Sequence, residues 1–127
     1  MGVGMGPGPS CVRDLKIWVE GMALVNDSYT LTRSWPKDEL FGLTAQVRRA
    51  AVSIPCNLAE GRGRGTARET ARFAQIALGS AYELDTLLQI ATGLGLANEN
   101  VVDGMRERLN SLARQISSFI RSQRSGF

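Results

Sequence analysis

The feature that most constrains the fold of this chain is the regular spacing of its apolar side chains. In four successive segments, apolar residues recur at alternating steps of three and four, which places them on one face of an α-helix. Strand-type alternation of apolar and polar residues is absent from the sequence. The sequence therefore predicts an all-α protein. The four apolar stripes are Leu15, Trp18, Met22, Val25 and Tyr29; Leu40, Leu43, Val47, Ala51, Ile54 and Leu58; Phe73, Ile76, Ala77, Ser80, Leu84, Leu87 and Ala91; and Val102, Met105, Leu109, Leu112, Ile116 and Phe119.

Short breaks between the stripes give the expected helix boundaries. Residues 1–10 are rich in Gly and Pro and are expected to form a disordered tail, and residues 123–127 a flexible tail. A single four-helix domain is expected between them, over residues 11–122. The predicted helices span about residues 12–32, 36–60, 67–92 and 99–122.

Individual residues mark where the later helices begin. Pro36 presets the first-turn dihedral of the second helix. Thr66 and Glu69 form a capping box at the third helix, in which each side chain accepts a hydrogen bond from a free backbone N–H, and Asn98 caps the fourth. Pro55 lies within the second helix, but the apolar spacing stays in register beyond it. We therefore expect a kinked, continuous helix there.

The connections between the predicted helices are short, and this restricts the topology. Helices of about 20 to 27 residues joined by short turns must run antiparallel to their neighbours along the chain. Each stripe also advances by seven residues for every two turns, a spacing typical of shallow left-handed crossings. The prediction is an antiparallel, left-handed, up-down-up-down four-helix bundle.

Several classes of chemistry are excluded by what the sequence lacks. There is no histidine, which removes the usual general base and the usual zinc ligand. Two cysteines, Cys11 and Cys56, are too few for a disulfide framework or a structural metal site, and Cys56 is expected to be a small buried residue. Without histidine, Glu60, Glu83 and Asp85 do not suit a di-iron bundle site. We expect no catalytic residue, no metal and no cofactor.

No apolar run approaches the roughly 20 residues that are needed to span a bilayer. The first residues also lack the basic start and apolar stretch of a signal peptide. No membrane partner and a cytoplasmic location are therefore expected.

The positive charge is concentrated in one short segment. The chain carries a net charge of +3, and the segment from Gly61 to Arg72 accounts for all of it. All but two of the 15 basic residues are arginines, whose planar guanidinium groups suit phosphates and carboxylates. This bias favours a contact surface for an anionic partner.

The arginines near the predicted turn between the second and third helices form the candidate site. Three glycines in the sequence GRGRG are expected to leave backbone N–H groups exposed, and the start of the third helix adds its dipole. GRGRG is not a P-loop, because it lacks the Gly-Lys-Ser/Thr ending and joins two helices. The alternative is a solvated face whose arginines pair with Asp and Glu. The candidate nucleic-acid-binding residues are Arg48, Arg49, Arg62, Arg64, Arg68 and Arg72.

Residues 41–88 also resemble a known family. The stretch reads FGLTAQVRRAAVSIPCNLAEGRGRGTARETARFAQIALGSAYELDTLL. Its FGLT, Arg-Arg pair, AAVSIP, NLAEG and ALGSAYEL elements are similar to those of the four helix bundle proteins encoded in intervening sequences of bacterial 23S ribosomal RNA genes. The same superfamily includes the accessory variability determinant of diversity-generating retroelements. In these relatives an aromatic residue commonly follows the AEG element, where this chain has Arg62.

The resemblance implies a closed four-helix bundle that assembles as a homo-oligomer, often a pentamer. It also implies a basic surface for nucleic acid, RNA or DNA, and for the retroelement relatives a reverse transcriptase partner. It implies no catalysis. The leading prediction is a non-enzymatic oligomer that binds nucleic acid through its arginines. The alternative is an oligomeric scaffold for a protein partner, with the arginines in ion pairs between subunits.

Overall fold

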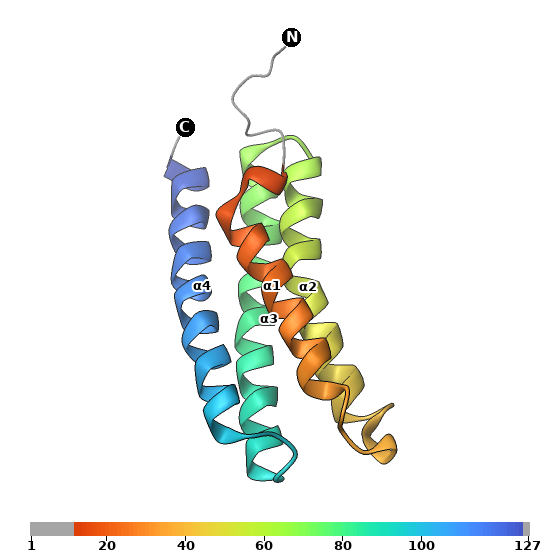
Figure 1. The fold of residues 1–127 in the computed structure, drawn as a ribbon. Helices are drawn as coiled ribbons and strands as arrows, with labels where there is room; N and C mark the ends of the chain where they lie inside the picture. Colours follow the sequence, from red (N-terminus) through yellow and green to blue (C-terminus); the bar gives the residue numbers. More distant parts are fainter. Residues whose placement is uncertain (1–11, 126–127) are drawn as a thin grey trace.

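Four long helices make up most of residues 12–125, the part of the chain that the computed structural model describes (Figure 1). Within this range there is no strand, and the all-α prediction is confirmed. None of these helices is both long and apolar enough to cross a membrane. The expectations for residues 1–10 and for Cys11 lie outside the described residues. The elements are η2 (Val12–Asp14), α1 (Lys16–Thr32), η3 (Lys37–Glu39), α2 (Leu43–Gly63), α3 (Ala67–Gly93) and α4 (Glu99–Ser125).

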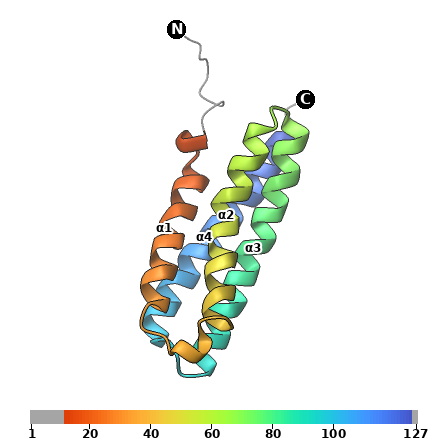
Figure 2. The same cartoon turned by 90° about the vertical axis from the view of Figure 1, so that its right-hand side faces the viewer.

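The helices pack side by side as a bundle. α2 contacts both α1 and α3, α3 contacts α4, and α1 meets α4 along a smaller seam. Figures 1 and 2 draw the α2–α3 turn, the start of α1 and the end of α4 at one end of the bundle. The α1–α2 and α3–α4 connections lie at the other. We call the first of these the turn end, defined by residues 62–66. The second is the connection end, defined by residues 33–42 and 94–98 and the two adjoining turns of each helix.

The core is a continuous set of aliphatic side chains contributed by all four helices. Val47 and Ile54 of α2, Leu84 of α3 and Ile116 of α4 are completely buried. Burial of one such side chain is worth about 1.5–3 kcal/mol, so this core is the main source of stability. Polar contacts also join the helices, among them a hydrogen bond of 2.7 Å between the Ser53 and Ser80 hydroxyls.

The most buried face of α1 is one residue away from the predicted apolar stripe, of which Leu15, Trp18 and Val25 are partly buried against the core. The side chains that α1 buries are those of Ile17, Leu24, Ser28 and Thr32, together with Gly21, whereas Met22, from the predicted stripe, is 39% exposed. Gly21 sets this register, because a Cβ there would lie 3.3 Å from Cγ2 of Ile54 and 3.5 Å from Cδ of Pro55. Gly21 and Ser28 therefore lie on the inward face of α1. Because neither is a large apolar residue, a search for apolar spacing does not detect that face.

The second helix begins later than predicted. Pro36 precedes the short turn η3, and α2 starts only at Leu43. The backbone of Gly42, with φ −106° and ψ −113°, separates the two elements. The Glu39 carboxylate accepts a hydrogen bond of 3.2 Å from the Leu43 N–H and so caps α2. The prediction that the helix continues through Pro55 is confirmed, since α2 is unbroken from Leu43 to Gly63.

Other boundaries and burials also differ from the predictions. α1 begins at Lys16 rather than near residue 12, and α4 continues to Ser125, so residues 123–125 are helical rather than a flexible tail. The apolar face of α4 extends to Ile120, which is buried, and this packing supports the extra turn. Cys56 is exposed, because it lies between the inward-facing Ile54 and Leu58 on the opposite side of α2. Ile76 and Leu40 are likewise more than two-fifths exposed.

Candidate nucleic-acid interface

Close contact between two helices shapes the turn between α2 and α3. A Cβ at Gly61 would lie 2.8 Å from Cβ of Phe73 and 3.1 Å from the Thr70 carbonyl oxygen, so only glycine fits there. The Thr70 hydroxyl donates a hydrogen bond of 3.2 Å to the Gly61 carbonyl. Gly65 has φ +83°, a backbone conformation that glycine adopts readily, and it reverses the chain. Two of the three glycines of GRGRG therefore have structural roles.

The turn does not expose its backbone N–H groups as expected. The N–H of Arg64 donates to the Gly61 carbonyl at 3.2 Å, and that of Gly65 donates to the Arg62 carbonyl at 3.3 Å. Half of the capping box is present, because the Thr66 hydroxyl accepts a hydrogen bond of 3.1 Å from the Glu69 N–H. The Glu69 carboxylate accepts from Arg72 instead of from the Thr66 N–H. The polar groups that this end of the bundle offers to an anion are therefore those of its side chains.

Arg62 turns into the bundle. Its guanidinium carbon lies 5.7 Å from the centre of the Phe119 ring of α4. Its Nε is buried and has no hydrogen-bond partner among the described residues. This arginine thus packs against an aromatic ring, and its side chain contributes less to the outer surface than the sequence suggested.

Arg64 and Arg72 lie over the same aromatic ring. Their guanidinium carbons are 5.0 Å and 4.5 Å from the centre of the Phe73 ring. Arg64 pairs with Glu60, and Arg72 pairs with Glu69, each at 3.0 Å. The hydrogen bond from Arg72, together with the charges of Arg72, Arg64 and Arg68, holds the pKa of Glu69 below its ordinary value of 4.5. These exposed pairs add little stability, but they neutralise part of the local charge.

Arg48 and Arg49 do not join the arginines of the turn. They lie near the start of α2, about 20 Å from Arg62 along the helix at 1.5 Å per residue. Arg48 Nε donates a hydrogen bond of 2.9 Å to the Thr32 hydroxyl, and the guanidinium lies 4.5 Å from the Tyr29 ring centre. Arg48 of α2 therefore contacts α1 and stabilises the packing of these two helices. The expectation of one basic surface formed by all six arginines is wrong.

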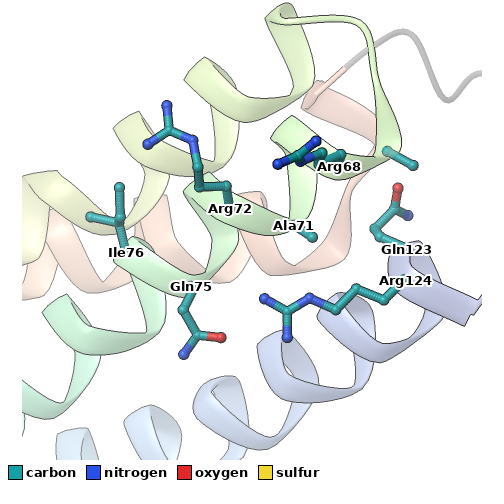
Figure 3. A pocket seen from close by; sticks show the side chains of 8 residues that line it. Arg68, Ala71, Arg72, Gln75, Ile76, Gln123 and Arg124 are labelled. Atoms are coloured by element: carbon teal, nitrogen blue, oxygen red, sulfur yellow. The ribbon is translucent and has the colours of Figure 1, made fainter.

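A cleft between α3 and α4 brings together basic side chains from distant parts of the sequence (Figure 3). Its volume is about 790 Å³. Figure 3 shows Arg68 and Arg72 extending from α3, while Arg124 extends from α4 toward Gln75. Among the described residues, no carboxylate forms an ion pair with Arg68 or Arg124. The lining residues are Ala67, Arg68, Ala71, Arg72, Gln75, Ile76, Gln123 and Arg124.

Sequence reasoning missed Gln75, Gln123 and Arg124. The sequence predicts a flexible tail at Gln123 and Arg124, and both residues are more than 50 residues from the turn along the chain. One signal was available, since α4 carries no acidic residue from Leu109 to its end at Ser125, although it carries three arginines there. Arg68 and Arg72 are the predicted site residues that do reach the cleft.

The described residues contain no group of three or more acidic or cysteine side chains that is arranged to hold a metal ion. What the cleft offers is guanidinium groups, two amide side chains and an apolar wall. This set can bind an anion and a flat polar group beside it.

The fold and the cleft define a class of protein, a small helical bundle with a basic groove beside one interhelical turn. The chain matches the family model of the 23S rRNA-intervening sequence protein over residues 13–118, and it belongs to that family. This match confirms the resemblance noted in the sequence. A comparison with curated proteins gave no significant match.

Proposed function

We propose that this protein is a non-enzymatic, homo-oligomeric bundle that binds nucleic acid through the cleft between α3 and α4. The observation that carries the proposal is that Arg68, Arg72 and Arg124 line one recess. Glu69 forms an ion pair with Arg72, and the guanidinium groups of Arg68 and Arg124 have no carboxylate partner among the described residues. A polyanion would neutralise this concentration of charge.

The chemistry of the cleft suits a phosphodiester chain. Arginine binds phosphate oxygens through paired N–H donors, and each neutralised phosphate releases counterions into solution. Gln75 and Gln123 add amides that can donate to and accept from base edges. Ile76, which is 43% exposed, gives a base an apolar surface to lie against. Such a site binds phosphates mainly by charge and adds a smaller contribution from the base.

Direct binding measured across salt concentrations tests the proposal. Labelled RNA and DNA oligonucleotides are titrated with the full chain, and affinity should fall steeply as salt rises from about 50 to 200 mM. The native mass of the same sample gives the number of subunits, for which a pentamer is expected. If neither RNA nor DNA binds the assembled protein near 50 mM salt, the nucleic-acid function is wrong.

An alternative function is an oligomeric scaffold that recruits a protein partner such as a reverse transcriptase. A different surface favours it. Phe41, just before α2, is 93% exposed, and Leu40 and Tyr29 lie beside it around a hollow of about 500 Å³. Exposed aromatic and aliphatic side chains of this kind are typical of protein interfaces. A Phe41→Ser variant that loses a protein partner but keeps its affinity for nucleic acid would favour the scaffold.

We also propose that the bundle has up-down-up-down order and left-handed crossings. The short connections and the seven-residue spacing of the core positions in α2 and α4 support this topology. Interhelical crossing angles near +20° in a crystal structure are the expected result, and angles near −50° would contradict it.

A further inference from the structure

A second hollow lies between the same two helices. Its volume is about 340 Å³, and Tyr82 of α3 and Arg114, Ser117 and Arg121 of α4 contribute to its lining. Tyr82 is 58% exposed, so more than half of this residue is open to solvent. Neither this hollow nor Tyr82 was part of the predicted site.

Helical periodicity places the residues of both hollows on the same face of α3 and on the same face of α4. On α3, positions 68, 72, 75 and 82 follow steps of four, three and seven, so they share one face of the helix. On α4, positions 114, 117, 121 and 124 follow steps of three, four and three and also share one face. Residues 68 and 82 are about 21 Å apart along α3 at 1.5 Å per residue. We call this surface, from Arg68 to Tyr82 on α3 and from Arg114 to Arg124 on α4, the α3–α4 groove.

The α3–α4 groove carries an unbalanced positive charge along its length. α4 contributes Arg114, Arg121 and Arg124 in a stretch without acidic residues, and none of the three forms an ion pair with a described carboxylate. Basic residues are favoured in the last turn of a helix by its dipole, but that effect fades beyond one turn. It accounts for Arg124 and leaves Arg114 and Arg121 unexplained.

We propose that the α3–α4 groove binds one single strand of RNA or DNA across both hollows, with a base stacked on Tyr82. This inference rests on the proposed function and specifies its ligand. At the 3.4 Å rise of stacked bases, a groove of about 21 Å holds at most roughly six nucleotides, and an extended, unstacked strand places fewer nucleotides in it. The arginines follow the phosphates, while the exposed Tyr82 ring supplies a stacking surface that accepts any base.

The shape of the site favours a single strand over a duplex. Packed helices have axes about 8–10 Å apart, so the recess between them accepts a base or a phosphate but not a double helix. Proteins that read a duplex insert a protruding helix or ribbon into a groove about 12 Å wide. In this protein the binding surface is a recess, and only an unpaired base can turn outward and enter it.

The test compares variants of the distal hollow with a charge-matched control. Tyr82→Ala and the double variant Arg114→Gln/Arg121→Gln should each weaken binding of a ten-nucleotide single strand by about tenfold or more. The control, Arg33→Gln/Arg49→Gln, removes the same charge from exposed positions at the connection end and should change affinity less than twofold. Circular dichroism and native mass of each variant establish that it is folded and assembled. Parallel series with RNA and DNA strands identify which sugar the groove prefers.

Three results would overturn the inference, and they separate it from the proposed function. If the distal variants bind as the unmodified protein does while Arg68→Gln/Arg72→Gln/Arg124→Gln loses affinity, nucleic acid binds at the turn end only, and the proposed function stands. If a duplex of the same length competes equally, the ligand is not a single strand. If the unmodified protein binds no strand near 50 mM salt, both the inference and the proposed function fail.

Discussion

Two glycines set how closely the helices of this bundle approach one another. Gly21 brings α1 onto the side chains of Ile54 and Pro55, and Gly61 brings the end of α2 against Phe73 and the backbone of α3. The contact at Gly61 is the tighter one, because its neighbours include two carbonyl oxygens of a helix, which cannot rotate away. Gly79, in contrast, has open space around its Cα.

Substitution of Gly61 by alanine should therefore destabilise the fold. Because the new Cβ would overlap Phe73 and backbone atoms, we expect Gly61→Ala to lower the free energy of unfolding by about 1–3 kcal/mol. The matched control is Gly79→Ala, which should raise it by about 0.5–1 kcal/mol, since alanine is the better helix former. Urea denaturation of both variants measures the difference, and equal effects would show that the close contact at Gly61 does not exist.

Arg48 allows a second test at the residue scale. Its hydrogen bond to Thr32 and its stacking on Tyr29 indicate a structural role, so Arg48→Ala should lower the free energy of unfolding by about 1–2 kcal/mol. Its affinity for nucleic acid should not change. Arg49→Ala, which removes an exposed neighbour, should alter stability by less than about 0.5 kcal/mol. A large loss of nucleic-acid affinity in Arg48→Ala would contradict the structural role and show that this residue takes part in binding.

At the scale of the helices, sequence pattern predicted some faces well and one poorly. The buried stripe of α4 follows Val102, Met105, Leu109, Leu112 and Ile116 as expected, because large apolar residues fill most of the inward positions. Ala113 is also buried there, and the predicted Phe119 is only partly buried. On α1, small and polar residues occupy part of the inward face, and the larger Met22 and Tyr29 are left partly exposed. Apolar periodicity identifies a buried helix face when large apolar side chains fill the space between helices. It fails where two helices pack so closely that only a glycine or another small residue fits between them.

The corrected face of α1 can be tested by truncation. Leu24 is 1% exposed, and Leu24→Ala should cost about 2–5 kcal/mol of unfolding free energy through lost burial and a cavity. Met22→Ala on the neighbouring face should cost less than about 1 kcal/mol. If Met22→Ala costs as much unfolding free energy as Leu24→Ala, another surface covers Met22. If that surface belongs to a second subunit, the native mass of the Met22→Ala variant should be lower than that of the unmodified protein.

The candidate site was only half predictable at this scale. Arg68 and Arg72 were identified because they are four residues apart on one helix near the turn. Arg124 was not, since its approach to α3 depends on the length and the packing of α4. A charge count over one segment cannot reveal that two helices distant in sequence bring their arginines to the same cleft. The sequence does show that the end of α4 has arginines and no acidic residue.

For the whole molecule, the important property is a basic groove in a protein that contains no histidine. Nucleic-acid binding should therefore be independent of pH between about 5 and 7, because no side chain with an ordinary pKa in that range is present. Glu69 stays ionised throughout, since its pKa lies below 4.5. Its pairing with Arg72 contributes to stability above that value and is lost only as the pH falls through the lowered pKa. Fluorescence anisotropy at constant ionic strength measures the affinity, and a clear titration between pH 5 and 7 would point to a different binding group.

The salt dependence of binding tests the central claim most directly. For a single-stranded RNA, the logarithm of the association constant is measured against the logarithm of the salt concentration for three proteins. These are the unmodified chain, Arg68→Gln/Arg72→Gln/Arg124→Gln in the cleft, and Arg33→Gln/Lys37→Gln/Arg49→Gln at the connection end. Both variants remove the same charge, but only the first removes groups that contact phosphates in this account.

At about 0.7 per phosphate contact, the slope of the cleft variant should be shallower than that of the unmodified chain by about two, and the slope of the connection-end variant should be unchanged. Equal reductions in the two variants would contradict the account, because they would show that the protein attracts nucleic acid through its overall charge and not through the cleft between α3 and α4.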